Sequence, residues 1–142
     1  MSKNKNESAA VPALMARVKD NPKDLEAILE LGEIFNRAED WQKSLFFWSK
    51  GIELDPENLG ARYHRGYALL ELQRYEEAMP DYEFIVTAKP DAYQAHYYLG
   101  VIYKHVLKNP EMARKHLRLA QDAQPKDSGM VSEIQNQLSD LK

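Results

Sequence analysis

The chain has 142 residues, of which 44% are hydrophobic and 29% charged, a composition typical of folded proteins rather than disordered or fibrous ones. It contains no cysteine, which excludes disulfides, thiol catalysis and cysteine-rich metal sites. The net charge of −3 argues against a nucleic-acid partner, and no apolar run approaches the roughly 20 residues needed for membrane insertion. From the polar first ten residues we expect a cytoplasmic protein.

Residues recur along the chain at an interval of 34. Gly32, Gly66 and Gly100 keep this interval, and in the third unit the register slips by one, since Ala113 follows its glycine by 13 residues where Ser44 follows by 12. The same interval relates three alanines, three prolines and two pairs of aromatic residues: Ala27, Ala61 and Ala95; Pro22, Pro56 and Pro90; Trp41 and Tyr75; Trp48 and Tyr82. A fixed period of this length predicts repeated supersecondary units.

The N-terminal part is predicted to hold one helix after a short tail. We expect residues 1–8 to be a disordered tail. Ala10 and Leu14 fall one period before Ser44 and Trp48, so residues 9–20 are predicted to form the second helix of an incomplete unit. That helix would cap the N-terminal end.

Three complete units follow, at residues 25–58, 59–92 and 93–126. Ile28, Leu31 and Ile34, then Leu45 and Trp48, are spaced as on two helices separated by a short polar break. Each unit is therefore predicted to form two antiparallel helices. Pro80 should mark a delayed start or a kink in its helix, and N-cap residues are expected at four positions: Asp40, Asn58, Asp91 and Asn109.

The last predicted element is a helix within residues 127–141. Val131, Ile134, Leu138 and Leu141 recur at helical spacing on one face. A helix with one apolar face can cover the end of the third unit, so we expect a C-terminal capping helix.

These features resemble the tetratricopeptide repeat family, whose 34-residue unit carries a Leu-Gly pair, small residues, aromatics and a closing proline. The pair is matched by Leu31-Gly32 and Leu99-Gly100, whereas the second unit has Arg65 before Gly66. Further departures are Arg62 and His96, at a position where a large apolar residue is common. The resemblance implies an all-α fold, a right-handed α-solenoid of stacked antiparallel helix pairs in a single domain over residues 9–141.

The resemblance also implies a function, because tetratricopeptide arrays bind a peptide or helix of a partner protein in a concave groove lined by first helices. The groove positions of the family fall on Glu26, Leu29, Glu33, Tyr63, Tyr67, Leu70, Tyr97, Val101, Lys104 and His105. Three of these are tyrosines, which supply large and fairly rigid contact areas at interfaces. We expect them to form one patch; the alternative is that they pack helices together.

Charge is distributed unevenly over the units. Residues 24–57 hold nine acidic and three basic side chains, whereas residues 93–118 hold one acidic and five basic. The leading hypothesis is a non-catalytic adaptor, scaffold or chaperone-like module for a protein partner. The alternative is a self-assembling head-to-tail homo-oligomer, in which the acidic unit of one copy meets the basic unit of the next.

No catalytic signature supports an enzyme. The sequence has no Gly-rich phosphate loop, no dinucleotide fingerprint and no His-Glu-x-x-His helix. Its four histidines match no metal-binding spacing, so no metal and no cofactor are expected. Some family members hold a terminal carboxylate with Lys, Asn and Arg side chains at matching groove positions. Here those positions carry Glu, Leu, His, Tyr and Gln, which argues against Hsp70 and Hsp90 tails as partners.

Overall fold

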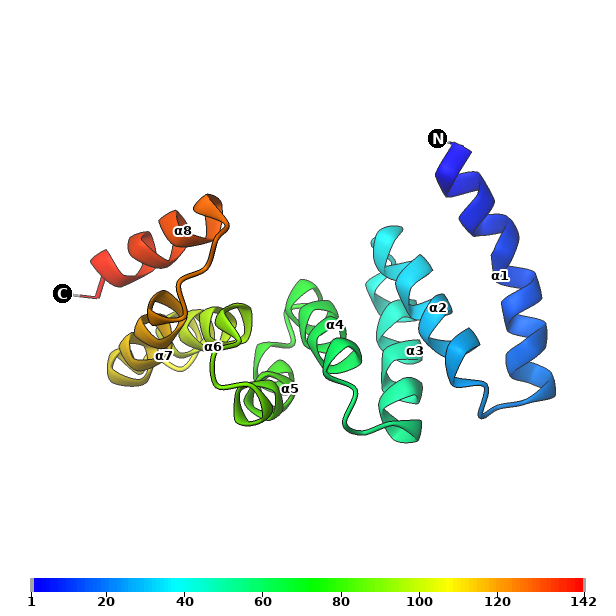
Figure 1. Ribbon diagram of the computed structural model, residues 1–142, viewed down its shortest axis with the longest axis horizontal. Helices are drawn as coiled ribbons and strands as arrows, with labels where there is room; N and C mark the ends of the chain where they lie inside the picture. The colour runs from blue at the N-terminus through cyan, green and yellow to red at the C-terminus, as the bar shows by residue number, and fades with distance from the viewer. Residues whose placement is uncertain (1, 142) are drawn as a thin grey trace. The chain divides into compact units, whose positions relative to one another are not determined.

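The computed structural model describes residues 2–141, with side chains from Ser8 onward. This part of the chain holds eight α-helices and no strand (Figure 1). In chain order the helices are α1 (Ser2–Asp20), α2 (Leu25–Arg37), α3 (Trp41–Leu54), α4 (Leu59–Glu71), α5 (Tyr75–Ala88), α6 (Tyr93–His105), α7 (Pro110–Asp122) and α8 (Ser128–Ser139). The all-α fold predicted from the sequence is confirmed.

The chain packs as two compact units, residues 1–74 with α1 to α4 and residues 75–142 with α5 to α8. Within each unit every helix contacts the next one along the chain. The short connections make such neighbours antiparallel, as the sequence predicted for each helix pair. The division falls inside the predicted repeat 59–92, and the repeat boundaries themselves stay predictions.

Side chains cap most of the helix N-termini. Asp24, Asp40, Asn58 and Asn109 each accept a hydrogen bond from a backbone N–H in the first turn of the following helix. These bonds satisfy N–H groups that have no partner within the helix. The cap expected at Asp91 is wrong, because α6 begins one residue later and its N-cap is Ala92, whose side chain cannot accept a hydrogen bond.

A residue in the left-handed region recurs in the turn that joins the two helices of each pair. The φ angles are 57° at Glu39, 60° at Gln73 and 54° at Lys108. The third turn is one residue longer, since the N–H of Asn109 bonds to the carbonyl of Tyr103, six residues back, where Asp40 bonds five residues back. The register slip in the third unit is therefore absorbed in the connection between α6 and α7.

Helix α1 begins earlier than expected. It starts at Ser2, whereas the sequence analysis expected a disordered tail over residues 1–8; residue 1 lies outside the described residues. The segment 2–9 contains no glycine or proline to end the helix, so the helix that packs through Leu14 continues through it. Pro80 and Pro12 both lie inside helices, so the delayed start suggested for Pro80 is not observed, and each removes one backbone hydrogen bond.

Each unit has a glycine pressed against the second helix of the pair. A Cβ added at Gly32 would lie 2.9 Å from the indole of Trp48, and one added at Gly100 would lie 2.6 Å from Cγ of Leu117. Only glycine lets the helices approach this closely. The period of 34 residues thus marks helix-crossing points in both units.

Candidate functional site

In unit 1, the predicted groove positions on α2 are acidic and lie at the surface. The side chain of Glu26 is 76% exposed, and its Oε1 lies 3.6 Å from Nη2 of Arg17 on α1. Oε2 of Glu33 lies 3.9 Å from Nη1 of Arg37. Leu29 behaves differently, because it is half-buried and packs against the core formed by Trp48, Ile52 and Ala61. On α2, therefore, the two carboxylates are open to a ligand and the leucine mainly supports the core.

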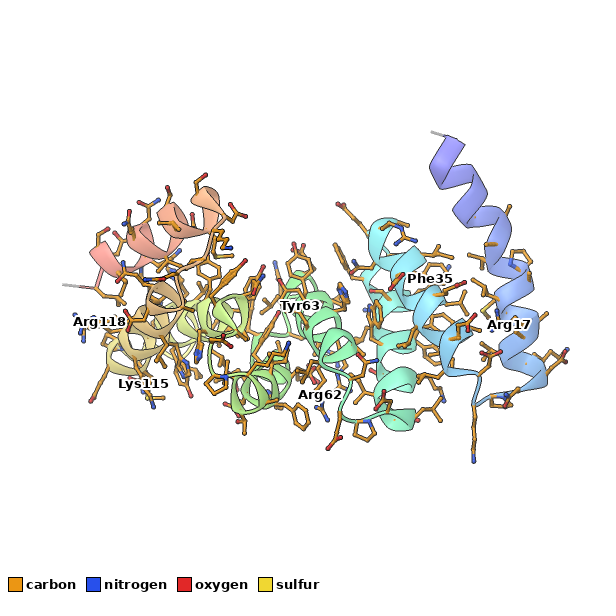
Figure 2. All side chains as sticks on the ribbon, in the orientation of Figure 1. Arg17, Phe35, Arg62, Tyr63, Lys115 and Arg118 are labelled. Carbon is orange, nitrogen blue, oxygen red and sulfur yellow. The ribbon has the colours of Figure 1, made fainter. Side chains whose placement is uncertain are left out.

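The predicted positions on α4 are aromatic and apolar. Tyr63, Tyr67 and Leu70 are half-buried, and the two tyrosines are one turn apart on the same helical face (Figure 2 labels Tyr63). The ring of Tyr67 meets Trp41 of α3 edge-on at 5.6 Å between centroids. We call these three residues, with Glu26, Leu29 and Glu33, the unit 1 face; α2 and α4 contact each other in this unit.

Beside the unit 1 face, a histidine ring completes the packing of the core. His64 stacks on Trp48 with 4.8 Å between ring centroids and an interplanar angle of 19°. Burial lowers the pKa of His64, against an opposing effect of the carboxylate of Glu33. The ring is therefore kept neutral at physiological pH, which suits a packing role.

In unit 2, the predicted positions lie on α6 and three of them contact α8. We call Tyr97, Val101, Lys104 and His105 the unit 2 face. The hydroxyl of Tyr97 donates to Oε1 of Glu133 at 3.2 Å, and Nε2 of His105 donates to Oε1 of Gln137 at 3.1 Å. Burial, then the charge of Glu133, raises the pKa of Tyr97 to about 12, so this hydroxyl remains a donor.

Lys104 has the most complete set of partners on the unit 2 face. Its Nζ donates to the carbonyl of Gln137 at 2.8 Å, to Oε1 of Gln137 at 2.9 Å and to Oδ2 of Asp140 at 3.1 Å. Its side chain is only 9% exposed. A lysine this buried needs such partners, because an unpaired charge away from water is costly.

The family resemblance predicts that Tyr97, Lys104 and His105 face a partner, but in the structure they bond to Glu133, Gln137 and Asp140 at the chain's own α8. Apolar spacing predicts a helix over the end of the third unit, but not the role of its polar residues. Glu133, Gln137 and Asp140 are spaced four and three apart, as on one helical face. That spacing was the available signal.

Unit 2 also contains a hydrogen-bonded pair of histidines. Nδ1 of His96 lies 3.1 Å from Nδ1 of His116, and Nε2 of His96 lies 2.7 Å from the carbonyl of Pro90. A carbonyl only accepts, so Nε2 of His96 carries a proton; when both rings are neutral, Nδ1 of His96 accepts and Nδ1 of His116 donates. Burial, then His96 and Lys115, lowers the pKa of His116 to about 4. The described residues hold no cluster of three or more side chains suited to a metal ion.

The model of the tetratricopeptide repeat family matches residues 48–83 and 66–128, which together span more than half of the chain. The chain belongs to this family. The resemblance seen in the sequence is thereby confirmed.

Stretches similar to this chain occur in much longer proteins. The chain is 28% identical over 113 residues to anaphase-promoting complex subunit 3 of Schizosaccharomyces pombe, covering 80% of this chain and 17% of that protein. It is 32% identical over 94 residues to the TPR repeat-containing thioredoxin TTL4 of Arabidopsis thaliana, covering 66% of this chain and 14% of that protein. The chain thus spans less than a fifth of these relatives.

Among solved structures, MamA from Desulfovibrio magneticus RS-1 superimposes with a TM-score of 0.76. The identity is 21%, and the match covers 95% of this chain and 83% of that one. At this identity the match shows the shared fold. Family membership supports a protein–protein interaction module. None of the described helices has the length and apolar character of a membrane span.

Proposed function

We propose that the chain is a non-catalytic adaptor, scaffold or chaperone-like module that binds a segment or helix of another protein on its first helices. The observation that carries this proposal is the pair Tyr63 and Tyr67, half-buried and one turn apart on the unit 1 face. Partly exposed tyrosines combine apolar contact area with a hydroxyl, and such residues concentrate binding energy at interfaces. No step of this function requires a cofactor.

The acidic residues of unit 1 suggest the chemistry of the bound segment. Glu26 and Glu33 lie on α2, which contacts the helix of the tyrosines, within a stretch of nine acidic and three basic side chains. We therefore expect a partner segment with an apolar anchor and basic groups beside it.

A randomised peptide library displayed on phage would test the unit 1 face. Peptides selected on the wild-type chain should bind the double variant Tyr63→Ala/Tyr67→Ala at least tenfold more weakly, measured by fluorescence anisotropy. Phe46→Ala is the matched control, because Phe46 is a 55% exposed aromatic on α3 of the same unit but outside the face. Equal losses in both variants would contradict the proposal.

Self-assembly is a second candidate function, favoured by the charge difference between the two ends of the sequence. Residues 93–118 carry five basic side chains and one acidic one, and Lys115 and Arg118 are exposed on α7 (Figure 2). Opposite charges attract more strongly at low salt. Light scattering at low and high ionic strength should then show salt-sensitive oligomers, whereas a monomer at every salt concentration excludes this assembly.

A further inference from the structure

Helix α8 is held on the unit 2 face through polar contacts in a regular pattern. Tyr97, Lys104 and His105 are seven and eight residues apart and share one side of α6. They contact Glu133 and Gln137, which share one side of α8, and Asp140, the C-cap residue of that helix. The contact is therefore a match between donors on α6 and acceptors on α8.

The unit 2 face is built to receive oxygen atoms. The side chain of Lys104 is nearly buried, and all three of its partners are oxygens of the last turn of α8 or the residue after it. The carbonyl groups of a helix C-terminus carry partial negative charge, which favours a lysine at that place. Any segment that replaced α8 would have to supply equivalent oxygens, since the charge would otherwise be left uncompensated.

The apolar contact of α8 is smaller than that of α7. Ile134 is its one buried residue, with Val131 and Leu138 half-buried, whereas α7 buries Ala113, Leu117 and Ala120. A cavity of about 170 Å³ lies between α7 and α8, lined among others by Pro125, Val131 and Ile134. A helix with one buried apolar anchor and an incompletely filled contact can separate without opening the rest of its unit.

We propose that α8 is a displaceable occupant of the unit 2 face, and that a partner replaces it with a helix whose carboxylate and amide oxygens repeat the spacing of Glu133, Gln137 and Asp140. This inference rests on the proposed function, in which the faces of first helices bind protein segments. The tethered α8 competes with the partner at high effective concentration, so the partner's apparent affinity is reduced by the fraction of chains that are open.

A synthetic peptide of residues 127–141, amidated at its C-terminus, is the probe for this competition. It should bind the full chain carrying Ile134→Ser at least tenfold more tightly than the wild type, because the substitution weakens the internal competitor. In the Ile134→Ser background, Lys104→Gln should weaken peptide binding at least tenfold. Lys89→Gln, at an exposed lysine of the same unit, should leave it unchanged. Circular dichroism checks that each variant is folded.

Hydrogen exchange of the wild-type chain gives a second, independent readout. Amides of α8 should exchange at least tenfold faster than those of α6 and α7. Exchange of all three helices at one rate, or equal peptide binding by the Lys104→Gln and Lys89→Gln variants, would overturn the inference. Neither result would affect the library experiment on Tyr63 and Tyr67. Failure of this inference and failure of the proposed function can therefore be distinguished.

Discussion

The helix pair α2–α3 of unit 1 and the helix pair α6–α7 of unit 2 each stack two rings, at the same two positions of the repeat. In unit 1, Phe35 stacks on Phe47 at 5.7 Å with an interplanar angle of 10°. In unit 2, Tyr103 stacks on His116 at 5.6 Å and 4°. The geometry is shared although unit 1 has two phenylalanines at these positions and unit 2 a tyrosine and a histidine, so the helix pair determines where the rings lie and not their chemistry.

The two units differ at the repeat position of Ile28 in unit 1 and His96 in unit 2. Ile28 is buried in the apolar core of unit 1, whereas the equivalent His96 of unit 2 is bonded to His116 and to the carbonyl of Pro90. The buried ring of His96 is tolerated here because both of its nitrogens have hydrogen-bond partners. Unit 1 thus has an apolar contact at this position, whereas unit 2 has a hydrogen-bonded pair of histidines.

The largest expected effect comes from removing the indole at the helix crossing of unit 1. Trp48 is 2% exposed, and Trp48→Ala should lower the free energy of unfolding by about 3–5 kcal/mol through lost burial and a new cavity. Urea unfolding followed by the fluorescence of the remaining Trp41 would measure it. A loss below about 1 kcal/mol would mean that unit 1 is not organised around this side chain.

The crossing-point glycines offer a direct comparison between the units. Gly32→Ala and Gly100→Ala should each cost about 1–3 kcal/mol by overpacking, with the larger loss at Gly32 because a rigid indole cannot yield as a leucine can. Gly60→Ala is the control, since its Cβ would meet only Asn58 at 3.4 Å and alanine favours the helix. Thermal unfolding followed by circular dichroism would compare the three variants. Destabilisation by Gly60→Ala alone would refute the assignment of Gly32 and Gly100 to tight helix crossings.

The histidine pair should make unit 2 less stable in acid. The pKa of His116 is lowered to about 4, below its ordinary value of 6.5, so the unfolded chain binds the proton more readily. The free energy of unfolding should therefore fall as pH drops from 6.5 to about 4, by on the order of 1 kcal/mol once solvent screening around this half-exposed ring is included. Hydrogen exchange of α6 and α7 against pH would report it.

A double variant tests whether this acid sensitivity belongs to the pair. His96→Ile/His116→Phe gives unit 2 the side chains that unit 1 carries at these positions, and its stability should depend less on pH over the same range. Both proteins keep His64, whose pKa is also lowered, so its contribution cancels in the comparison. An unchanged pH dependence would assign the effect elsewhere.

The smallest effect is expected at the helix caps. Ala92 has nearly the same backbone angles as Asp24 but caps α6 without a side-chain bond. Ala92→Asp should stabilise unit 2 by about 0.5–1 kcal/mol, whereas Asp24→Ala should destabilise unit 1 by removing the bonds to Ala27 and Arg17. Thermal midpoints would show shifts of opposite sign; shifts of the same sign would contradict the capping argument.

Most helices could be predicted from the sequence because apolar spacing and capping residues act locally. Ile28, Leu31 and Ile34 place α2, and Asn58 and Asn109 start helices where expected. The misplaced cap at Asp91 and the helical Ser2 show the limit. Both depend on where a helix starts, and a helix start is weakly specified where no strong cap or breaker marks it.

The candidate site was less predictable. The sequence indicates that Tyr63 and Tyr67 share one helical face, because four residues separate them. It does not show that Leu29 is directed into the core or that Lys104 is enclosed by Gln137 and Asp140, more than 30 residues away. Such contacts depend on how helices cross.

The sequence by itself determined the period of 34, the helix pairs and the small residues at helix crossings, since each follows from the spacing of residues along the chain. The tertiary structure alone decided which predicted binding residues stay accessible and which are bonded to α8. The sequence does not indicate which residues the polar side chains of α8 will bond to, because the partners lie on α6 and come close only when the two helices pack together.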